Sequence, residues 1–242
     1  MSENNFNLPK HIAFIMDGNR RWAKAKGLQS FSGHFEGAKT LERFIDNTGK
    51  LQDIPYITFW GGSVNNLTVR PKLEIKALFD VYEEWFTKLL KRKELIEEDI
   101  RVRIIGNWTG LAPASLQKVF TELSNKTKDH KRRNLTFLIA YSGKEEIVEA
   151  IKKISNLKSS SSEINEVLIE KSLWTGDLPP VDLVIRTGID KNDAPHWSSG
   201  FMMWLCANSQ FYFTKTLWPD FSEKELEKAL GIYTSSQRRF GK

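Results

Sequence analysis

The amino-acid sequence predicts an α/β fold: a single domain with a largely parallel central β-sheet flanked by helices. Short apolar runs alternate with longer segments in which apolar residues recur at helical spacing. Such alternation favours parallel strands that are joined by right-handed crossovers. The chain has 242 residues, 40% of them hydrophobic, which fits one medium-sized core. We therefore expect one domain over residues 1–242, with a flexible lead over residues 1–9.

The individual elements follow from these patterns in chain order. Strands are expected at 11–16, 56–60, 101–105, 135–140, 182–185 and 210–213. Helices with one apolar face are expected at 37–51, 75–90, 115–127, 145–157 and 222–233. Pro71 is typical of the first turn of a helix. Ser222 with Glu225 matches the capping-box pattern at the start of the last helix.

Polar residues follow four of the predicted strands. They are Asp17, Ser63, Ser142 and Arg186. In an open parallel sheet the ligand crevice lies beyond the carboxyl ends of the strands. We therefore expect these four side chains to meet on one rim of the sheet.

The charge and the cysteine content restrict the function classes. The formal net charge of +6 favours anionic partners such as phosphorylated small molecules. The basic residues are scattered and match no nucleic-acid-binding module, so no nucleic-acid partner is expected. The single cysteine, Cys206, excludes an intrachain disulfide and fits a reducing compartment. The sequence has neither a membrane-spanning run nor the apolar core of a signal peptide. The predicted location is the cytoplasm, and a peripheral membrane contact stays open.

The stretch "HIAFIMDGNRRW" (11–22) has two interpretations. Asp17, Gly18 and Asn19 are turn residues, and a solvated surface turn would explain them. A binding site would also explain why Arg20 and Arg21 follow a carboxylate at the end of a buried strand. These residues alone leave both interpretations open.

Other cations and glycines favour the binding site. In "GHFEGA" (33–38), Gly33 and Gly37 flank His34 at a predicted helix start, where free backbone N–H groups bind phosphate. Arg70 precedes a helix and Arg186 ends a strand. Arginines in such positions predict a clamp for a diphosphate group. The usual phosphate-binding glycine motifs are absent.

Six segments occur in the order, and at nearly the spacing, of the cis-prenyltransferases, the family of undecaprenyl diphosphate synthase. They are "HIAFIMDGNRRWAKAKG", "GHFEGA", "RPKLEIKALF", "PPVDLVIRTG", "FYFTKTLWPDF" and "RRFG". The chain resembles this family from about residue 10 to residue 241. The resemblance implies a Mg²⁺-dependent enzyme, usually a homodimer. An enzyme of this family condenses isopentenyl diphosphate with an allylic prenyl diphosphate to form a cis-polyprenyl diphosphate.

The resemblance also implies roles for single residues. Asp17 is expected to hold Mg²⁺ on the diphosphates and, with Asn66, to take part in catalysis. The residues expected to bind the substrates are Gly18, Asn19, Arg20, Arg21, Trp22, His34, Ser63, Arg70, Arg186, Ser199, Arg239 and Gly241. The last two match a terminal Arg-x-Gly that reaches the partner subunit's site. The product chain is expected between the helices at about 34–52 and 72–90, whose apolar faces also suit a plain core.

Several positions depart from the family pattern. Leu67 replaces a tryptophan, Asn65 a glutamate and Ser30 an arginine. Trp197 replaces an arginine in a loop that is longer than in the family. Gln210 replaces a metal-binding glutamate, and because an amide binds Mg²⁺ less well than a carboxylate, its role as a second ligand stays open.

These departures leave alternative functions open. Irregular prenyl coupling or terpene cyclisation would keep the fold and the diphosphate chemistry. A non-catalytic subunit of a heteromeric prenyltransferase would keep the fold alone. Gly61 leaves one tunnel position of the family without a side chain, which disfavours a very short product.

Overall fold

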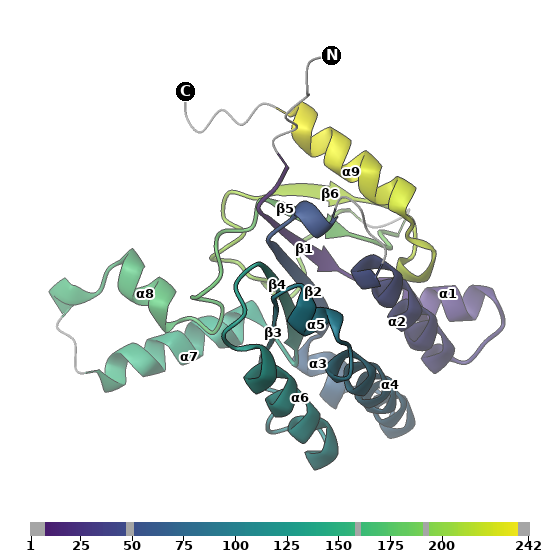
Figure 1. Cartoon of the computed structure of the whole chain (residues 1–242), viewed down its shortest axis with the longest axis horizontal. Coiled ribbons are helices and arrows are strands. Elements are labelled where there is room, and N and C mark those ends of the chain that lie inside the picture. The colour runs from purple at the N-terminus through teal and green to yellow at the C-terminus, as the bar shows by residue number, and fades with distance from the viewer. Residues whose placement is uncertain (1–7, 47–50, 158–160, 191–193, 237–242) are drawn as a thin grey trace.

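The computed structural model describes residues 8–46, 51–157, 161–190 and 194–236. Within these ranges the strands form one six-stranded sheet in the order β3-β4-β2-β1-β5-β6, and every neighbouring pair is parallel (Figure 1). The strands are β1 (His11–Ile15), β2 (Tyr56–Gly62), β3 (Ile100–Ile105), β4 (Arg133–Ile139), β5 (Leu183–Arg186) and β6 (Gln210–Phe213). The predicted fold class is confirmed, and each predicted strand is found to within about two residues of its ends.

Helices connect the strands. They are α1 (Asn19–Ala25), α2 (Ser30–Asp46), α3 (Val64–Thr68), α4 (Lys72–Leu90), α5 (Glu94–Glu97), α6 (Ala114–Thr127), α7 (Gly143–Asn156), α8 (Glu166–Ser172) and α9 (Glu223–Ser235). Short 3₁₀ turns lie at Leu51–Asp53, Ser161–Glu163 and Trp218–Asp220. The five predicted helices are present, whereas the short helices α1, α3, α5 and α8 were not predicted. No helix in the described ranges is long and apolar enough to cross a membrane.

The predicted start of the first long helix was wrong, because α2 begins at Ser30 and not at Gly37. Gly33 and Gly37 lie inside α2 and permit close packing against α1. A Cβ atom at Gly33 would lie 1.9 Å from the backbone oxygen of Asn19, and one at Gly37 would lie 2.3 Å from its Oδ1. The two glycines therefore serve helix packing, and the predicted phosphate site at a helix start there is not formed.

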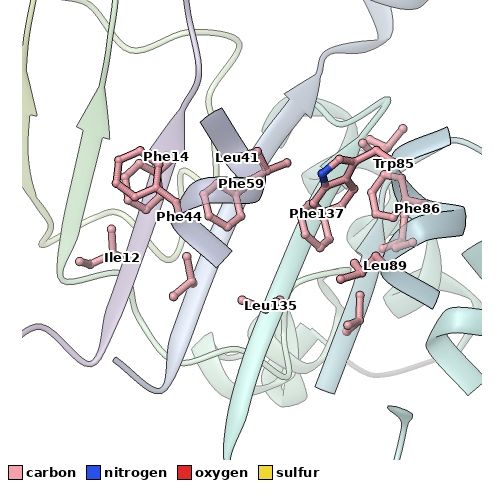
Figure 2. Packing of buried hydrophobic residues seen from close by; sticks show 14 of the residues in the cluster. Ile12, Phe14, Leu41, Phe44, Phe59, Trp85, Phe86, Leu89, Leu135 and Phe137 are labelled. Carbon is pink, nitrogen blue, oxygen red and sulfur yellow. The ribbon is translucent and has the colours of Figure 1, made fainter. Parts of the chain in front are cut away.

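The main core lies between the sheet and helices α2, α4, α6 and α9. Phe14, Phe59 and Phe137 stand side by side on β1, β2 and β4, with ring centroids 5.1 and 5.8 Å apart (Figure 2). Trp85 and Phe86 of α4 pack edge-on against Phe137. Burial of aromatic side chains of this size dominates the stability of such a core.

The opposite face of the sheet is covered largely by an irregular segment. Buried residues of 173–206, among them Phe201, Met202 and Cys206, pack there on Ala13 and Ile15 of β1. Burial raises the pKa of the Cys206 thiol to about 12. Cys206 therefore behaves as an apolar core residue.

Helices α7 and α8 form an arm that projects from one side of the molecule (Figure 1). The two helices contact each other, and the arm leaves large apolar side chains in solvent. These exposed residues are Val148, Ile151, Leu157, Ile164 and Val167. An apolar surface of this kind on a monomer typically marks a protein interface.

Candidate functional site

A polar cavity of about 760 Å³ opens at the carboxyl ends of β1 and β2. Its position follows from the register, since Ile15 at the end of β1 lies beside Trp60 of β2 and Arg186 of β5. The lining residues that the sequence predicted are Asp17, Gly18, Asn19, Arg20, Arg21, His34, Ser63, Asn66, Arg70 and Ser199. The structure thus gathers most of the predicted substrate-binding residues around one cavity.

Asp17 and Gly18 form the turn from β1 into α1. Gly18 is buried and has a φ of 110°, in the left-handed region that glycine adopts without strain. A Cβ atom there would lie 2.8 Å from Leu217 Cδ2. The Gly18 N–H donates to Asp17 Oδ1 over 2.6 Å, which fixes the carboxylate at the cavity. This turn is therefore packed against the protein and is not a solvated surface turn.

Two guanidinium groups approach the Asp17 carboxylate. Arg21 Nη2 lies 3.2 Å from Oδ1, and Arg186 Nη2 lies 3.5 Å from Oδ2. The Asp17 side chain is 44% exposed, whereas that of Arg186 is only 7% exposed. Arg186 also donates to the backbone oxygen of His196, while its Nε–H has no acceptor among the described residues. A buried N–H without an acceptor is costly, and an oxygen of a bound anion would satisfy it.

A second cationic cluster lies where α2 meets α4. Glu74 Oε1 lies 3.0 Å from Arg70 Nη1 and 3.3 Å from Arg20 Nε. Arg70 Nη1 also lies 3.0 Å from His34 Nε2. Burial, and then the charge of Arg70, lower the pKa of His34 to about 4. His34 is therefore neutral near pH 7, and its Nε2 accepts a hydrogen bond from Arg70.

Ser63 and Asn66 form a reciprocal cap at the start of α3. Ser63 Oγ accepts from the Asn66 N–H, and Asn66 Oδ1 accepts from the Ser63 N–H, each over 3.2 Å. Both residues line the cavity, and this cap holds both side chains in place beside it.

Some predicted residues lie elsewhere. Trp22 is buried against the body of the protein, and its Nε1 donates to Asp220 over 2.8 Å. Gln210 begins β6 and pairs with Leu183, at the other end of β5 from Arg186. Strands rise about 3.3 Å per residue, so Gln210 is remote from Asp17 of the same chain. Arg239 and Gly241 lie outside the described residues.

The sequence did not identify several residues at the cavity. Lys24 lines it one helical turn after Arg20, and a cation at that spacing was a usable signal. Glu74 stands four residues after Arg70, so the sequence spacing also indicated an i,i+4 ion pair between the two. Trp60 and Ser198 line the cavity as well, without a signal in the sequence. Ser142, which the sequence predicted on the same rim, does not line the cavity; its Oγ donates to the backbone oxygen of Ser199, which does line it.

A small apolar pocket of about 60 Å³ continues the polar cavity between α2, α4 and β2. Its lining includes Leu41, Tyr82, Trp85 and Trp218. The Tyr82 hydroxyl donates to the Gly61 backbone oxygen over 2.5 Å. The space at Gly61 is not open, because a Cβ atom there would lie 2.4 Å from Ile139 Cδ1. The expected tunnel position is thus filled by neighbouring side chains.

Asp17 is the carboxylate best placed to share a metal ion with a bound anion. Among the described residues there is no cluster of three or more His, Cys, Asp or Glu side chains. Mg²⁺ commonly binds through one or two carboxylates together with phosphate oxygens and water. The half-exposed Asp17 beside Arg21 and Arg186 fits that kind of site and not a site built from protein ligands alone.

The comparisons with known proteins agree with this geometry. The chain matches the prenyltransferase family model described as "Putative undecaprenyl diphosphate synthase" over residues 15–241. It is 38% identical to an isoprenyl transferase of Aquifex aeolicus, covering 97% of this chain and 96% of the relative. It is 35% identical to the (2E,6E)-farnesyl-diphosphate-specific ditrans,polycis-undecaprenyl-diphosphate synthase of Micrococcus luteus, covering 100% and 96% of the two chains.

A solved structure gives the same result. The structure of lavandulyl diphosphate synthase from Lavandula x intermedia in complex with dimethylallyl diphosphate matches with a TM-score of 0.86 and 32% identity. The match covers 97% of this chain and 99% of that one. The agreement of the family model, the full-length relatives and the fold means that this chain belongs to the undecaprenyl diphosphate synthase family of cis-prenyltransferases.

Proposed function

We propose that the protein transfers an allylic prenyl group from its diphosphate to isopentenyl diphosphate and thereby forms a cis-prenyl diphosphate. One observation carries the proposal: two separate arginine clusters lie at one cavity, which Arg20, Arg21 and Arg70 line while Arg186 stands behind Asp17. Arg21 and Arg186 surround Asp17, and Arg20 and Arg70 meet at Glu74. Two diphosphate substrates need two anion sites, and guanidinium pairs suit diphosphate oxygens.

The two clusters differ in what they offer. The cluster of Asp17, Arg21 and Arg186 lies at the end of β1. It suits the allylic diphosphate, whose negative charge grows as its bond to the allylic carbon breaks. The second cluster lies beside Ser63 and Asn66, whose side chains α3 holds at the cavity. We assign this cluster to isopentenyl diphosphate.

We propose Mg²⁺ as the cofactor, held by Asp17 and the oxygens of a bound diphosphate. When bound, Mg²⁺ supplies charge stabilisation to the departing diphosphate. Arg186 orients the Asp17 carboxylate from its buried side, and Arg21 holds its other oxygen. Gln210 is too far along β6 to join Asp17 within one chain, so any contribution from it requires a second subunit.

We propose a homodimer in the cytoplasm. The edge strand β6 carries exposed Phe211, which stacks on Phe213 at 5.8 Å and meets Trp197 at 5.9 Å. The arm of α7 and α8 adds Ile151, Val167 and their exposed apolar neighbours. Two apolar surfaces that one chain leaves in solvent fit the core of an oligomer interface.

A second candidate function is irregular coupling of short prenyl units. The observation that favours it is the small size of the apolar pocket, which has a volume of about 60 Å³. A long prenyl chain does not fit there unless Tyr82 or Trp85 moves. The similar lavandulyl diphosphate synthase structure carries dimethylallyl diphosphate, a short substrate.

One assay separates these functions. The purified full chain is incubated with Mg²⁺, labelled isopentenyl diphosphate and dimethylallyl, geranyl or farnesyl diphosphate in turn. Linear products extended by whole isoprene units support the main proposal, and branched or cyclic products support the second. Absence of any product with all three primers at several Mg²⁺ concentrations would contradict both.

A further inference from the structure

We propose that the rim of the cavity is a docking surface for a membrane that carries anionic lipids. The surface, called here the mouth patch, consists of Leu28, Phe31, Phe35, Val69 and Leu73. Their exposed fractions range from 41% at Phe35 to 83% at Leu73. Large apolar side chains gathered in solvent at one place typically mark an interaction site.

The mouth patch draws its residues from two neighbouring segments of the fold. Phe31 and Phe35 flank His34 on α2, and Val69 and Leu73 flank Arg70 at the start of α4. The two elements touch directly, since His34 Nε2 lies 3.0 Å from Arg70 Nη1. Side chains at i, i+3 and i+4 share a helix face, so Phe31 and Phe35 lie beside His34 on α2. Val69 and Leu73 stand one residue before and three residues after Arg70 in the chain.

The mouth patch also borders the entrance of the cavity. Leu28 belongs to both, and His34 and Arg70 line the cavity between the two halves of the patch. A chain that leaves the apolar pocket would therefore meet the patch first. This step rests on the proposed function, because it assumes a prenyl product.

Lysines around the mouth patch identify the partner as an anionic surface. Lys24 and Lys26 lie on the side of Leu28, Lys39 on the side of Phe35, and Lys72 beside Leu73; all four are exposed. Among the described residues, no carboxylate pairs with Lys24, Lys26 or Lys72, and only Lys39 has an ionic partner, Glu36. Apolar side chains ringed by lysines match the composition of segments that bind at the lipid interface.

The mouth patch is distinct from the arm, one of the two surfaces assigned to the dimer. α1 and α2 lie on one side of the molecule, and the arm of α7 and α8 lies on the other (Figure 1). A dimer through the arm therefore leaves the mouth patch available to a membrane.

Vesicle flotation tests the proposal with the full chain. The vesicles contain phosphatidylcholine alone or phosphatidylcholine with phosphatidylglycerol. We expect binding that requires phosphatidylglycerol and weakens with salt. The double variant Phe31→Ser/Phe35→Ser should bind at least about ten-fold more weakly, since two aromatic rings no longer enter the interface. Lys26→Gln/Lys72→Gln should lower binding only at low salt.

The matched control is Ile96→Ser/Ile232→Ser, which removes two similarly exposed apolar side chains from α5 and α9. It should bind like the wild type. Thermal melting confirms that each variant is folded. Equal binding of the Phe31→Ser/Phe35→Ser variant and the control, or no binding of the wild type, would overturn the proposal.

Prenyl transfer is measured in parallel without vesicles, with a short soluble primer. Phe31→Ser/Phe35→Ser should keep the wild-type rate. If this variant loses transfer in solution but still binds vesicles, the patch is a cover for the substrate and the docking proposal is wrong. If no protein transfers prenyl groups while vesicle binding behaves as expected, the proposed function fails and the docking surface stands.

Discussion

Arg186 Nη2 lies 3.5 Å from Asp17 Oδ2, although these residues stand at the ends of different strands, β5 and β1. The parallel register places the two strand ends level, so a buried guanidinium supports a half-exposed carboxylate from behind. In the proposed function the Asp17 carboxylate would hold a metal ion, and the Nε–H of Arg186, which has no acceptor among the described residues, would donate to a phosphate oxygen.

Asp17→Ala should lower the rate of prenyl transfer by at least about 100-fold, a loss of about 3 kcal/mol in barrier terms. The reason is that Asp17 is the carboxylate between Arg21 and Arg186, the arginines proposed to bind the allylic diphosphate. The side chain is half exposed, so the melting temperature should change by less than about 5 °C. The control is Asp80→Ala, which removes an exposed acid that pairs with Lys76 on α4. A variant at position 17 with more than about a tenth of the wild-type rate would exclude the assigned role.

Stability should fall as the pH is lowered from about 6.5 to about 4. Burial lowers the pKa of both His11 and His34 to about 4, below the ordinary value of 6.5. In that window the unfolded chain takes up protons on these residues and the folded chain does not. Each residue then lowers the free energy of unfolding by about 1.4 kcal/mol for each unit by which the pH falls. Above pH 6.5 both are neutral in either state and contribute no slope.

Urea unfolding at several pH values measures this slope. His34→Asn removes the contribution of one residue, so its stability should depend less steeply on pH between 6.5 and 4 than that of the wild type. An identical slope for the variant and the wild type would mean that His34 is already protonated in the folded protein at pH 6.

Tyr82 should limit the length of the product. Its hydroxyl donates a hydrogen bond to the Gly61 backbone oxygen, and the residue lines the apolar pocket between α2 and α4. Tyr82→Ala should lengthen the product by at least one isoprene unit, at a cost of about 3 kcal/mol in stability. Tyr82→Phe keeps the ring and should leave the product length nearly unchanged. Chromatography of the dephosphorylated products measures both, with Tyr233→Ala on α9 as the control. The same product length for Tyr82→Ala and wild type would show that the growing prenyl chain does not extend past Tyr82.

The strands were predictable because their cores are unbroken apolar runs, whereas their order β3-β4-β2-β1-β5-β6 in the sheet was not predicted. Convergence of Asp17 and Arg186 followed from the parallel-sheet rule alone. The contact of His34 with Arg70 did not, since it depends on how α2 packs on α4, which sequence spacing does not encode. α1 was missed because Asp17, Gly18 and Asn19 are turn residues, and only the buried, positive-φ Gly18 shows that they begin a helix. The position of Gln210 was likewise set by strand register, not by its motif.

The protein should be a dimer whose mass in solution is about twice the 27.9 kDa of one chain. Ile151→Asp/Val167→Asp places two charges on the exposed apolar side of the arm and should shift the protein to a monomer. Ile96→Asp/Ile232→Asp adds the same charges at exposed sites elsewhere and should leave the dimer intact. Light scattering at assay concentrations distinguishes the two. A wild-type monomer would exclude the dimer. If Ile151→Asp/Val167→Asp remains a dimer, the interface does not involve α7 and α8.

The last prediction concerns the metal. Transfer should require Mg²⁺ and stop in excess EDTA, because the arginines alone leave part of the diphosphate charge without compensation. Asp17 is the carboxylate beside the arginines proposed to bind diphosphate, so Asp17→Asn should raise the Mg²⁺ concentration at half-maximal rate by about ten-fold or more. Gln210→Glu should leave that concentration unchanged if one chain builds the site, since Gln210 pairs with Leu183 at the far end of β5. A Mg²⁺ titration of the three proteins with the same substrates gives both comparisons. Full activity in EDTA would exclude the metal, whereas a shift to lower Mg²⁺ in Gln210→Glu would show that strand β6 of a second subunit reaches the cavity.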